Sequence, residues 1–169
     1  MEASGRRHIF LTGTYELTID AKNRLSIPFA IRRKLNPDTH GHSFYAVPGR
    51  RRGTLSLYPE KYYEEMRADL PPDDALSEEA YEFRQFEYSQ SALLDPDAQG
   101  RVLIPERMLR RAGLEREVVL IAVRDHLELW RKEDFEEFER RHWENYHQQR
   151  ARAVQEQLEV ARSGRPETG

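Results

Sequence analysis

The chain has 169 residues, of which 38% are hydrophobic and 34% are charged, enough for one modest core beneath a large charged surface. A mean hydropathy of -0.87 and the lack of any run of about 20 apolar residues exclude a membrane-spanning protein. The absence of cysteine excludes disulfides, thiolate nucleophiles and cysteine-based zinc sites, and with no apolar signal-like stretch at the start we expect a soluble, cytoplasmic protein.

The net charge of -3 conceals an uneven distribution along the chain. Residues 14–61 hold nine basic and four acidic residues, a balance of +5, whereas residues 62–90 hold two basic and nine acidic residues, a balance of -7. Nucleic-acid recognition depends on a local basic face, so the acidic average does not exclude it.

Internal repetition is the main organising feature of the sequence. Asp20-Ala-Lys-Asn-Arg-Leu-Ser-Ile-Pro28 aligns with Asp97-Ala-Gln-Gly-Arg-Val-Leu-Ile-Pro105, with five of nine positions identical. Two later blocks follow in the same order: residues 44–47 match 120–123, and residues 55–58 match 127–130. The alignment offset falls from 76 to 72 between these blocks, so four extra residues lie in the loop 48–53 of the first copy. We therefore predict two repeats, residues 14–61 and 91–134.

Each repeat is predicted to be mainly β structure. Apolar residues alternate over 14–19 and again at 25–27, the period of a half-buried strand. The break at residues 20–24 predicts a tight hairpin turn, because Asn23, like Gly100 in the second copy, readily accepts a positive φ. Short helices are expected after the two Ile-Pro pairs, over residues 29–35 and 106–112, with Gly113 ending the second. Further strands are expected near residues 44–47, 54–58, 118–123 and 126–130.

The remaining segments are predicted to be mostly helical. The acidic connector spans residues 62–90 and is predicted to contain two helices. The first begins at Pro59 and ends before Pro71-Pro72, and the second is capped by Ser77. Aromatic residues at helical spacing predict one long C-terminal helix over residues 135–161. Residues 1–13 are an N-terminal extension, and residues 162–169 are expected to be disordered.

The two Asp-x-x-x-Arg hairpins, each followed by Ile-Pro and a short helix, together with residues 113–120 and 126–130, resemble the MraZ family, two-repeat relatives of AbrB-type regulators. The resemblance covers roughly residues 10–143. It implies a pseudo-twofold, swapped-hairpin β-barrel of two AbrB-like repeats with helices after each repeat. It also implies a ring-like homo-oligomer that binds double-stranded DNA, controls its own division and cell-wall operon, as a repressor, and is associated with the nucleoid. Asn23, the enlarged loop 48–53, the N-terminal extension and the acidic connector depart from the family pattern, which leaves the operator and the assembly size open.

A DNA-binding role is predicted first for the paired hairpin tips. We expect Asp20 to lie beside Arg24, and Asp97 beside Arg101, so that each long guanidinium is oriented before binding. The two arginines could then contact a guanine edge or a phosphate, while Lys22 suits a phosphate. Additional DNA contacts are weighed for two sets of arginines, Arg50, Arg51 and Arg52 in the enlarged loop and Arg6 and Arg7 in the N-terminal extension; a solvated loop is the simpler alternative for the first set. Five basic residues in the short helices that follow the Ile-Pro pairs are expected on exposed helix faces: Arg32, Arg33, Lys34, Arg110 and Arg111.

Enzymatic function finds little support in the sequence, and no cofactor or metal is expected. The chain lacks a phosphate-binding Gly-rich motif and a His-Glu-x-x-His helix, and His40 and His42 have no further ligand set. The main alternative is a protein-interaction or structural oligomer, such as an antitoxin-like partner of another protein, whose aromatic helices are its working surface.

Overall fold

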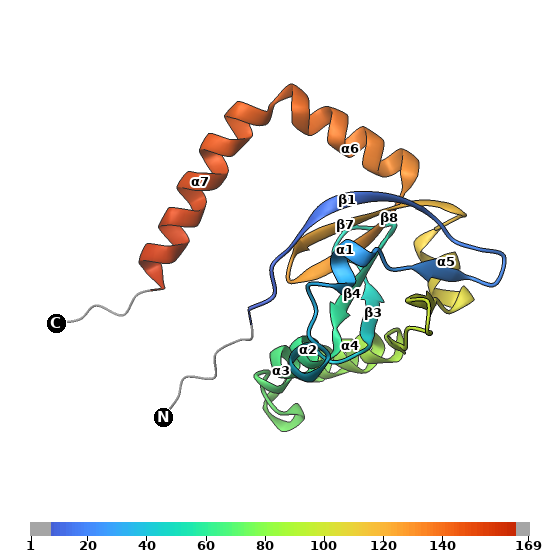
Figure 1. The fold of residues 1–169 in the computed structure, drawn as a ribbon. Coiled ribbons are helices and arrows are strands. Elements are labelled where there is room, and N and C mark those ends of the chain that lie inside the picture. The colour runs from blue at the N-terminus through green and yellow to red at the C-terminus, as the bar shows by residue number, and fades with distance from the viewer. Residues whose placement is uncertain (1–7, 165–169) are drawn as a thin grey trace. The chain divides into compact units, whose positions relative to one another are not determined.

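The computed structural model describes residues 8–164, which form a mixed α+β fold with a mostly antiparallel sheet and flanking helices (Figure 1). The chain divides into two units after Lys132. The strands all lie in the first unit and are β1 (Leu11–Thr18), β2 (Arg24–Ser26), β3 (Phe44–Pro48), β4 (Thr54–Pro59), β5 (Ala92–Leu94), β6 (Arg101–Leu103), β7 (Glu117–Arg124) and β8 (His126–Arg131).

Short helices connect these strands, and two longer helices follow them. They are α1 (Phe29–Arg32), α2 (Pro37–His40), α3 (Glu60–Ala68), the 3-10 turn η1 (Asp73–Ala75), α4 (Glu78–Ser89), α5 (Glu106–Ala112), α6 (Lys132–Glu144) and α7 (Tyr146–Ser163). In the described part of the chain, every helix is too short or too polar to cross a lipid bilayer.

Strands from the two sequence copies are interleaved in the larger sheet. The six-stranded sheet has the order β1-β7-β8-β4-β3-β5, and β2 and β6 form a separate antiparallel ladder. Thus β1 of the first copy pairs with β7 of the second, and β5 of the second copy pairs with β3 of the first. Within residues 8–164 the larger sheet is open, with β1 and β5 at its edges.

The core lies between the sheet and the β2–β6 ladder. Leu25 and Val102, which face each other in the ladder, are both fully buried, as are Ile104, Leu120 and other aliphatic residues of the same cluster. Burial of these side chains from both copies is the main stabilising contribution to the first unit.

Most predicted elements of the first unit are present. Ser77 caps α4 by accepting a hydrogen bond from the Ala80 amide at 3.2 Å, and Gly113 ends α5 in the left-handed conformation at φ 66°. β3 and β4 are joined by residues 49–53 and β7 and β8 by Asp125 alone, so the first connection is four residues longer.

Other elements differ from the predictions. The helix after Pro28 is regular only through Arg32. The sequence does not predict α2 and β5, because each is only three or four residues long. The C-terminal helix is interrupted at Asn145, whose backbone (φ -122°, ψ 20°) is not helical, and α7 continues two residues past the predicted end at 161. Arg6 and Arg7 lie outside the described residues.

Candidate functional site

The two hairpin turns have the same hydrogen-bonding pattern. In the first, Asp20 Oδ1 accepts from the amides of Lys22 and Arg24, both at 2.9 Å, and Asp20 Oδ2 accepts from Arg24 Nε at 2.7 Å. The Asp20 amide donates to the Arg24 carbonyl at 3.0 Å and closes the neck of the turn. The carboxylate therefore lies beside the guanidinium across the neck, as the repeated sequence predicts.

The second turn matches the first closely. Asp97 Oδ1 accepts from the amides of Gln99 and Arg101 at 2.9 and 3.0 Å, and Asp97 Oδ2 accepts from Arg101 Nε at 2.8 Å. Arg101 Nη2 also donates to Gln99 Oε1 at 3.2 Å. The first turn cannot form the corresponding hydrogen bond, because Lys22 stands in place of Gln99.

Both turns require a residue with positive φ at the fourth position. Asn23 has φ 62° and Gly100 has φ 77°, which confirms the turn geometry inferred from the sequence. The backbone amides and the arginine together lower the pKa of each aspartate: the amide of Arg24 has the largest effect on Asp20, and that of Arg101 on Asp97. Both carboxylates are thus ionised at neutral pH and hold their arginines by charge-assisted hydrogen bonds.

The β2–β6 ladder places the two arginines on one face. Arg24 pairs with Leu103 and Ser26 pairs with Arg101, and residues that are opposite or two apart in an antiparallel pair point to the same side. Leu25 and Val102 occupy the other side and are buried. The arginine side chains remain 30% and 31% exposed, so they are neither fully buried nor directed to opposite ends of the molecule.

The ladder is closed by two further symmetric hydrogen bonds. The Ile27 amide donates to the Gly100 carbonyl at 3.0 Å, and the Ile104 amide donates to the Asn23 carbonyl at 2.9 Å. Each turn is thus bonded directly to the strand of the other copy. This cross-bonding fixes the spacing of the two arginine-bearing tips.

Arg32 is a basic residue at this site whose position the sequence did not reveal. Its Nε donates to the Ile27 carbonyl at 2.9 Å, and its guanidinium lies so close to Gly100 that a Cβ there would be 2.6 Å from Nε. Arg32 is exposed on α1, as predicted, and it also packs against the second turn. No signal in the sequence marks this contact, because Leu109 occupies the equivalent position in the second copy.

The other predicted basic residues lie elsewhere. Arg50, Arg51 and Arg52 are exposed in the loop between β3 and β4, where the Arg51 guanidinium lies 5.0 Å from the Trp130 ring centroid, a cation–π contact. The loop is separate from the β2–β6 ladder in the sheet order. Lys22 is exposed at the first tip.

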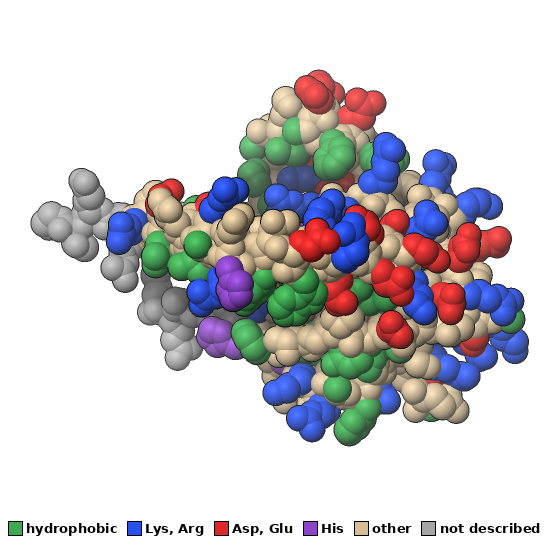
Figure 2. All heavy atoms as spheres, turned by 90° about the horizontal axis from the view of Figure 1, so that it is seen from above, with side chains coloured by type: hydrophobic (Ala, Val, Ile, Leu, Met, Phe, Trp, Pro, Cys, Tyr) green, Lys and Arg blue, Asp and Glu red, His purple; other side chains and the backbone are tan. Residues whose placement is uncertain are grey.

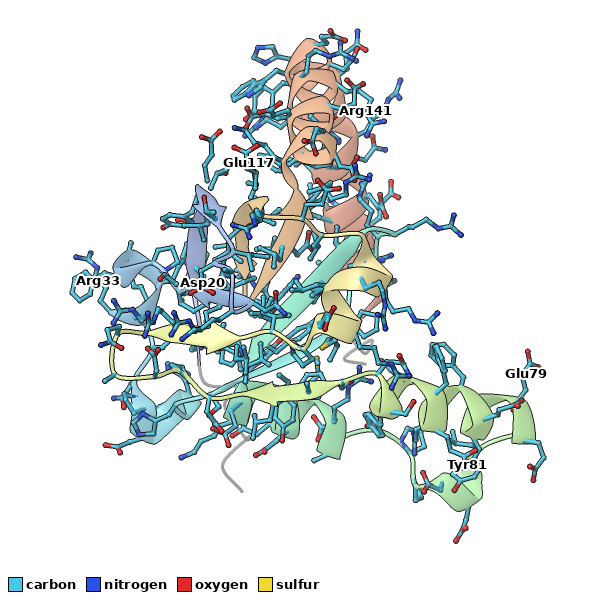
Figure 3. The ribbon with its side chains drawn as sticks, turned by 90° about the vertical axis from the view of Figure 1, so that its right-hand side faces the viewer. Asp20, Arg33, Glu79, Tyr81, Glu117 and Arg141 are labelled. Atoms are coloured by element: carbon cyan, nitrogen blue, oxygen red, sulfur yellow. The ribbon has the colours of Figure 1, made fainter. Side chains whose placement is uncertain are left out.

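The acidic connector lies apart from the first turn. Figure 3 labels Asp20 at the β1–β2 turn, and Glu79 and Tyr81 on α4 at the other side of that view. Figure 1 also shows α4 apart from the β1–β2 turn.

His40 has a structural role rather than a ligand role. Its Nδ1 accepts a hydrogen bond from the Asn36 amide at 2.9 Å at the start of α2, and the side chain is buried. Among the described residues, no group of three or more histidine, aspartate or glutamate side chains is arranged to hold a metal ion.

Comparison with known proteins gives a consistent result. A family model described as "MraZ protein, putative antitoxin-like" matches residues 88–157. The chain is 34% identical over 127 residues to the transcriptional regulator MraZ of Lactiplantibacillus plantarum, covering 75% of this chain and 86% of the relative. It is 32% identical to the protein of the same name from Mycoplasma mobile, over 73% of this chain and 81% of the relative. It is 29% identical to that from Heliobacterium modesticaldum, over 87% of this chain and 93% of the relative.

Proposed function

The chain belongs to the MraZ family, and from this premise we propose that it is a transcriptional regulator that binds DNA through its two hairpin tips. The observation that carries the proposal is the position of Arg24 and Arg101 on one exposed face of the β2–β6 ladder, each held by its own aspartate. Transcription regulation is a binding function, so no catalytic residue is assigned.

The geometry favours recognition of the DNA major groove by the two-stranded β2–β6 ladder. Arg24 and Arg101 are diagonal neighbours in an antiparallel pair, a relation that separates their backbones by about 7–8 Å, within the groove width of about 12 Å. Aspartate binds only Nε of each guanidinium, and among the described residues the two Nη atoms of Arg24 have no hydrogen-bond partner. These atoms are the pair that a guanine edge or a phosphate accepts from.

We assign supporting roles to the residues around the tips. Asp20 and Asp97 orient the arginines and do not contact DNA themselves. Lys22 binds a phosphate. Arg50, Arg51 and Arg52, and Arg6 and Arg7 beyond the described residues, are weaker candidates for backbone contacts.

We interpret the strand pairing as the swapped-hairpin arrangement implied by the family resemblance. β1 pairs with β7 and β5 with β3, so each copy contributes a strand to the other, and the β2–β6 ladder lies on the pseudo-twofold axis. Packing of the ladder over the six-stranded sheet is the feature that supports a barrel-like core.

We also propose that several chains assemble into a ring that engages spaced DNA repeats upstream of the protein's own division and cell-wall operon, as a nucleoid-associated repressor in the cytoplasm. A single chain presents few cations, so affinity per chain is low. Tips on neighbouring chains bind subsequent repeats at high effective concentration, which raises the overall affinity.

The direct test is a double substitution of the tips with a matched control. Arg24→Ala with Arg101→Ala removes both reading side chains, and Arg33→Ala with Arg110→Ala removes two exposed arginines at equivalent positions of the two copies. Gel shifts with the duplex upstream of the operon should show at least about 30-fold weaker binding for the first pair, because each bidentate contact contributes about 1–3 kcal/mol. The control pair should bind within about threefold of the unmodified chain.

Unchanged binding by the Arg24 and Arg101 pair, with thermal midpoint and oligomer mass preserved, would refute the proposal. A salt titration on repeat-containing and scrambled duplexes adds a second measurement. The slope of log K against log salt should become shallower for the tip variant, by about 0.9 for each phosphate that the removed arginines neutralise.

A protein-interaction function is the second candidate, favoured by exposed apolar side chains on the helices. Phe83 and Phe86 on α4 and Trp143, Leu158 and Val160 on α6 and α7 are all more than half exposed. A chain truncated after Asn145 separates the two functions: it should retain tip-dependent binding to a single repeat if DNA is the target. Loss of all binding to single repeats in a folded truncated chain would favour the second candidate.

A further inference from the structure

The first unit contains a pocket that the hairpin tips do not use. It has a volume of about 680 Å³, within the range of about 300–1,000 Å³ that is typical of small-molecule sites. Its walls come from the loop 49–53, the end of α4 with the start of β5, and α5. None of residues 20–24 or 97–101 lines it.

The lining combines cations with an apolar floor. Arg52, Arg107 and Arg111 are exposed at the pocket and Arg51 also lines it, and the described lining residues include no aspartate or glutamate. Leu55 and Met108 are buried beneath, and Phe86 forms an exposed aromatic wall. The guanidinium group of arginine can donate two parallel hydrogen bonds to phosphate oxygens. The apolar surface suits a planar or aliphatic group attached to the phosphate.

The pocket is lined by the enlarged loop of the first copy and by α5 of the second copy. The enlarged loop corresponds to Asp125 alone in the second copy, and Arg107 corresponds to Ala30 in the first copy. Two departures from the repeat, the enlarged loop and Arg107, therefore line the same pocket. Four arginines among lining residues that include no carboxylate favour an anionic ligand.

We propose that this pocket binds a small organic phosphate, with Arg52, Arg107 and Arg111 holding the phosphate groups and Phe86, Leu55 and Met108 packing against its apolar part. A site for such a ligand goes beyond DNA recognition and gives the chain a place where a metabolite could act. A nucleotide combines phosphate groups with a planar base, and it serves as the probe.

The test is a fluorescence titration of the full chain with N-methylanthraniloyl-ATP. We expect saturable binding that unlabelled ATP reverses. Arg107→Ala with Arg111→Ala should weaken this binding at least tenfold. Arg110→Ala, on the same helix but outside the pocket lining, should stay within twofold. Phe86→Ala should weaken the nucleotide more than it weakens pyrophosphate, measured by displacement.

The proposal is overturned if the intact chain shows no saturable binding, or if Arg110→Ala loses as much affinity as the pocket pair. It is also overturned if the pocket pair lowers oligomer mass in sedimentation while nucleotide binding persists, since the pocket would then hold another copy of the chain. Far-UV circular dichroism establishes that each variant is folded.

DNA is distinguished by the hairpin variant Arg24→Ala with Arg101→Ala. That variant should keep full nucleotide affinity, and an operator duplex should not displace the probe from it. Displacement by the duplex would identify the pocket as a DNA-backbone contact and overturn the small-ligand assignment, whereas the proposed function of the tips would be unaffected.

Discussion

Each hairpin aspartate stabilises its turn and also orients the arginine four residues later. Asp97 accepts three hydrogen bonds, two from backbone amides and one from Arg101 Nε. If the arginine contacts DNA and the aspartate only orients it, substitution of the arginine must weaken DNA binding more than substitution of the aspartate.

We predict that Asp97→Ala weakens operator binding about two- to tenfold, the cost of ordering one long side chain during binding. Arg101→Ala should weaken it more, by about 5- to 150-fold, because the side chain that touches DNA is itself removed. Both are measured by fluorescence anisotropy, with Asp97→Asn as a control that keeps the oxygen acceptor. A loss for Asp97→Ala equal to or larger than that for Arg101→Ala would show that the carboxylate is chiefly structural.

The positive-φ positions of the two turns are not interchangeable. A side chain at Gly100 would displace Arg32 from its hydrogen bond with the Ile27 carbonyl, so Gly100→Asn should lower the free energy of unfolding by about 1 kcal/mol. Asn23→Gly should change it by less than about 0.5 kcal/mol. Urea unfolding of both variants, repeated in an Arg32→Ala background, measures the coupling between residue 100 and Arg32. If Gly100→Asn lowers the free energy of unfolding equally in both backgrounds, the Arg32 contact is not the cause.

At the scale of elements, the β2–β6 ladder has one buried face and one exposed face that carries the two arginines. Leu25→Ala empties a fully buried position and should lower the free energy of unfolding by about 2–5 kcal/mol. Leu103→Ala, on the face shared with Arg24 and 60% exposed, should cost less than about 0.5 kcal/mol. Denaturant titration compares them, and equal costs would contradict the assigned faces.

The β7–β8 turn contains a titratable cluster that links the turn to α3. His126 Nδ1 lies 2.7 Å from Asp125 Oδ1 and Nε2 lies 3.2 Å from Glu128 Oε1, while Tyr62 donates to Asp125 Oδ2 at 2.9 Å. Burial alone would lower the pKa of His126, but the hydrogen bonds to Glu128 and Asp125 and their charges outweigh it and raise the pKa above 6.5. The same contacts lower the pKa of both carboxyl groups.

The stability that His126 contributes should therefore depend on pH. It is fully present below the unfolded pKa of about 6.5 and is lost as the pH rises through the higher folded pKa. The carboxylates lose their contribution only in acid, as the pH falls through their lowered folded pKa values. We expect the thermal midpoint of the unmodified chain to fall between pH 6 and pH 9, and His126→Gln to flatten this part of the curve; parallel curves would contradict the prediction.

At the scale of the whole molecule, acidic and basic side chains are interspersed on the face that Figure 2 shows. This mixture explains why the net charge of -3 gives no indication of nucleic-acid binding. The informative cations are those fixed by local hydrogen bonds at the tips.

The sequence was sufficient for features whose cause is local and repeated. The turn conformation at Asn23 and Gly100 and the cap at Ser77 follow from residue type, and the repeat made the first of these evident twice. The packing of Arg32 on Gly100 and the pocket at Arg107 depend on segments distant in the sequence, so no local pattern encodes them. β5 is too short to show periodicity, and only its pairing with β3 defines it.

The antiparallel course of β2 and β6 relates the two tips by a half-turn. The pair of tips therefore has nearly the same symmetry as a palindromic base sequence. The tips are not identical, because Lys22 gives the first a surplus positive charge and Gln99 leaves the second neutral. If the tips bind DNA as proposed, one chain docks on a duplex in two opposite directions with unequal free energies. A preferred direction on every repeat would give an array of such chains a polarity along the promoter.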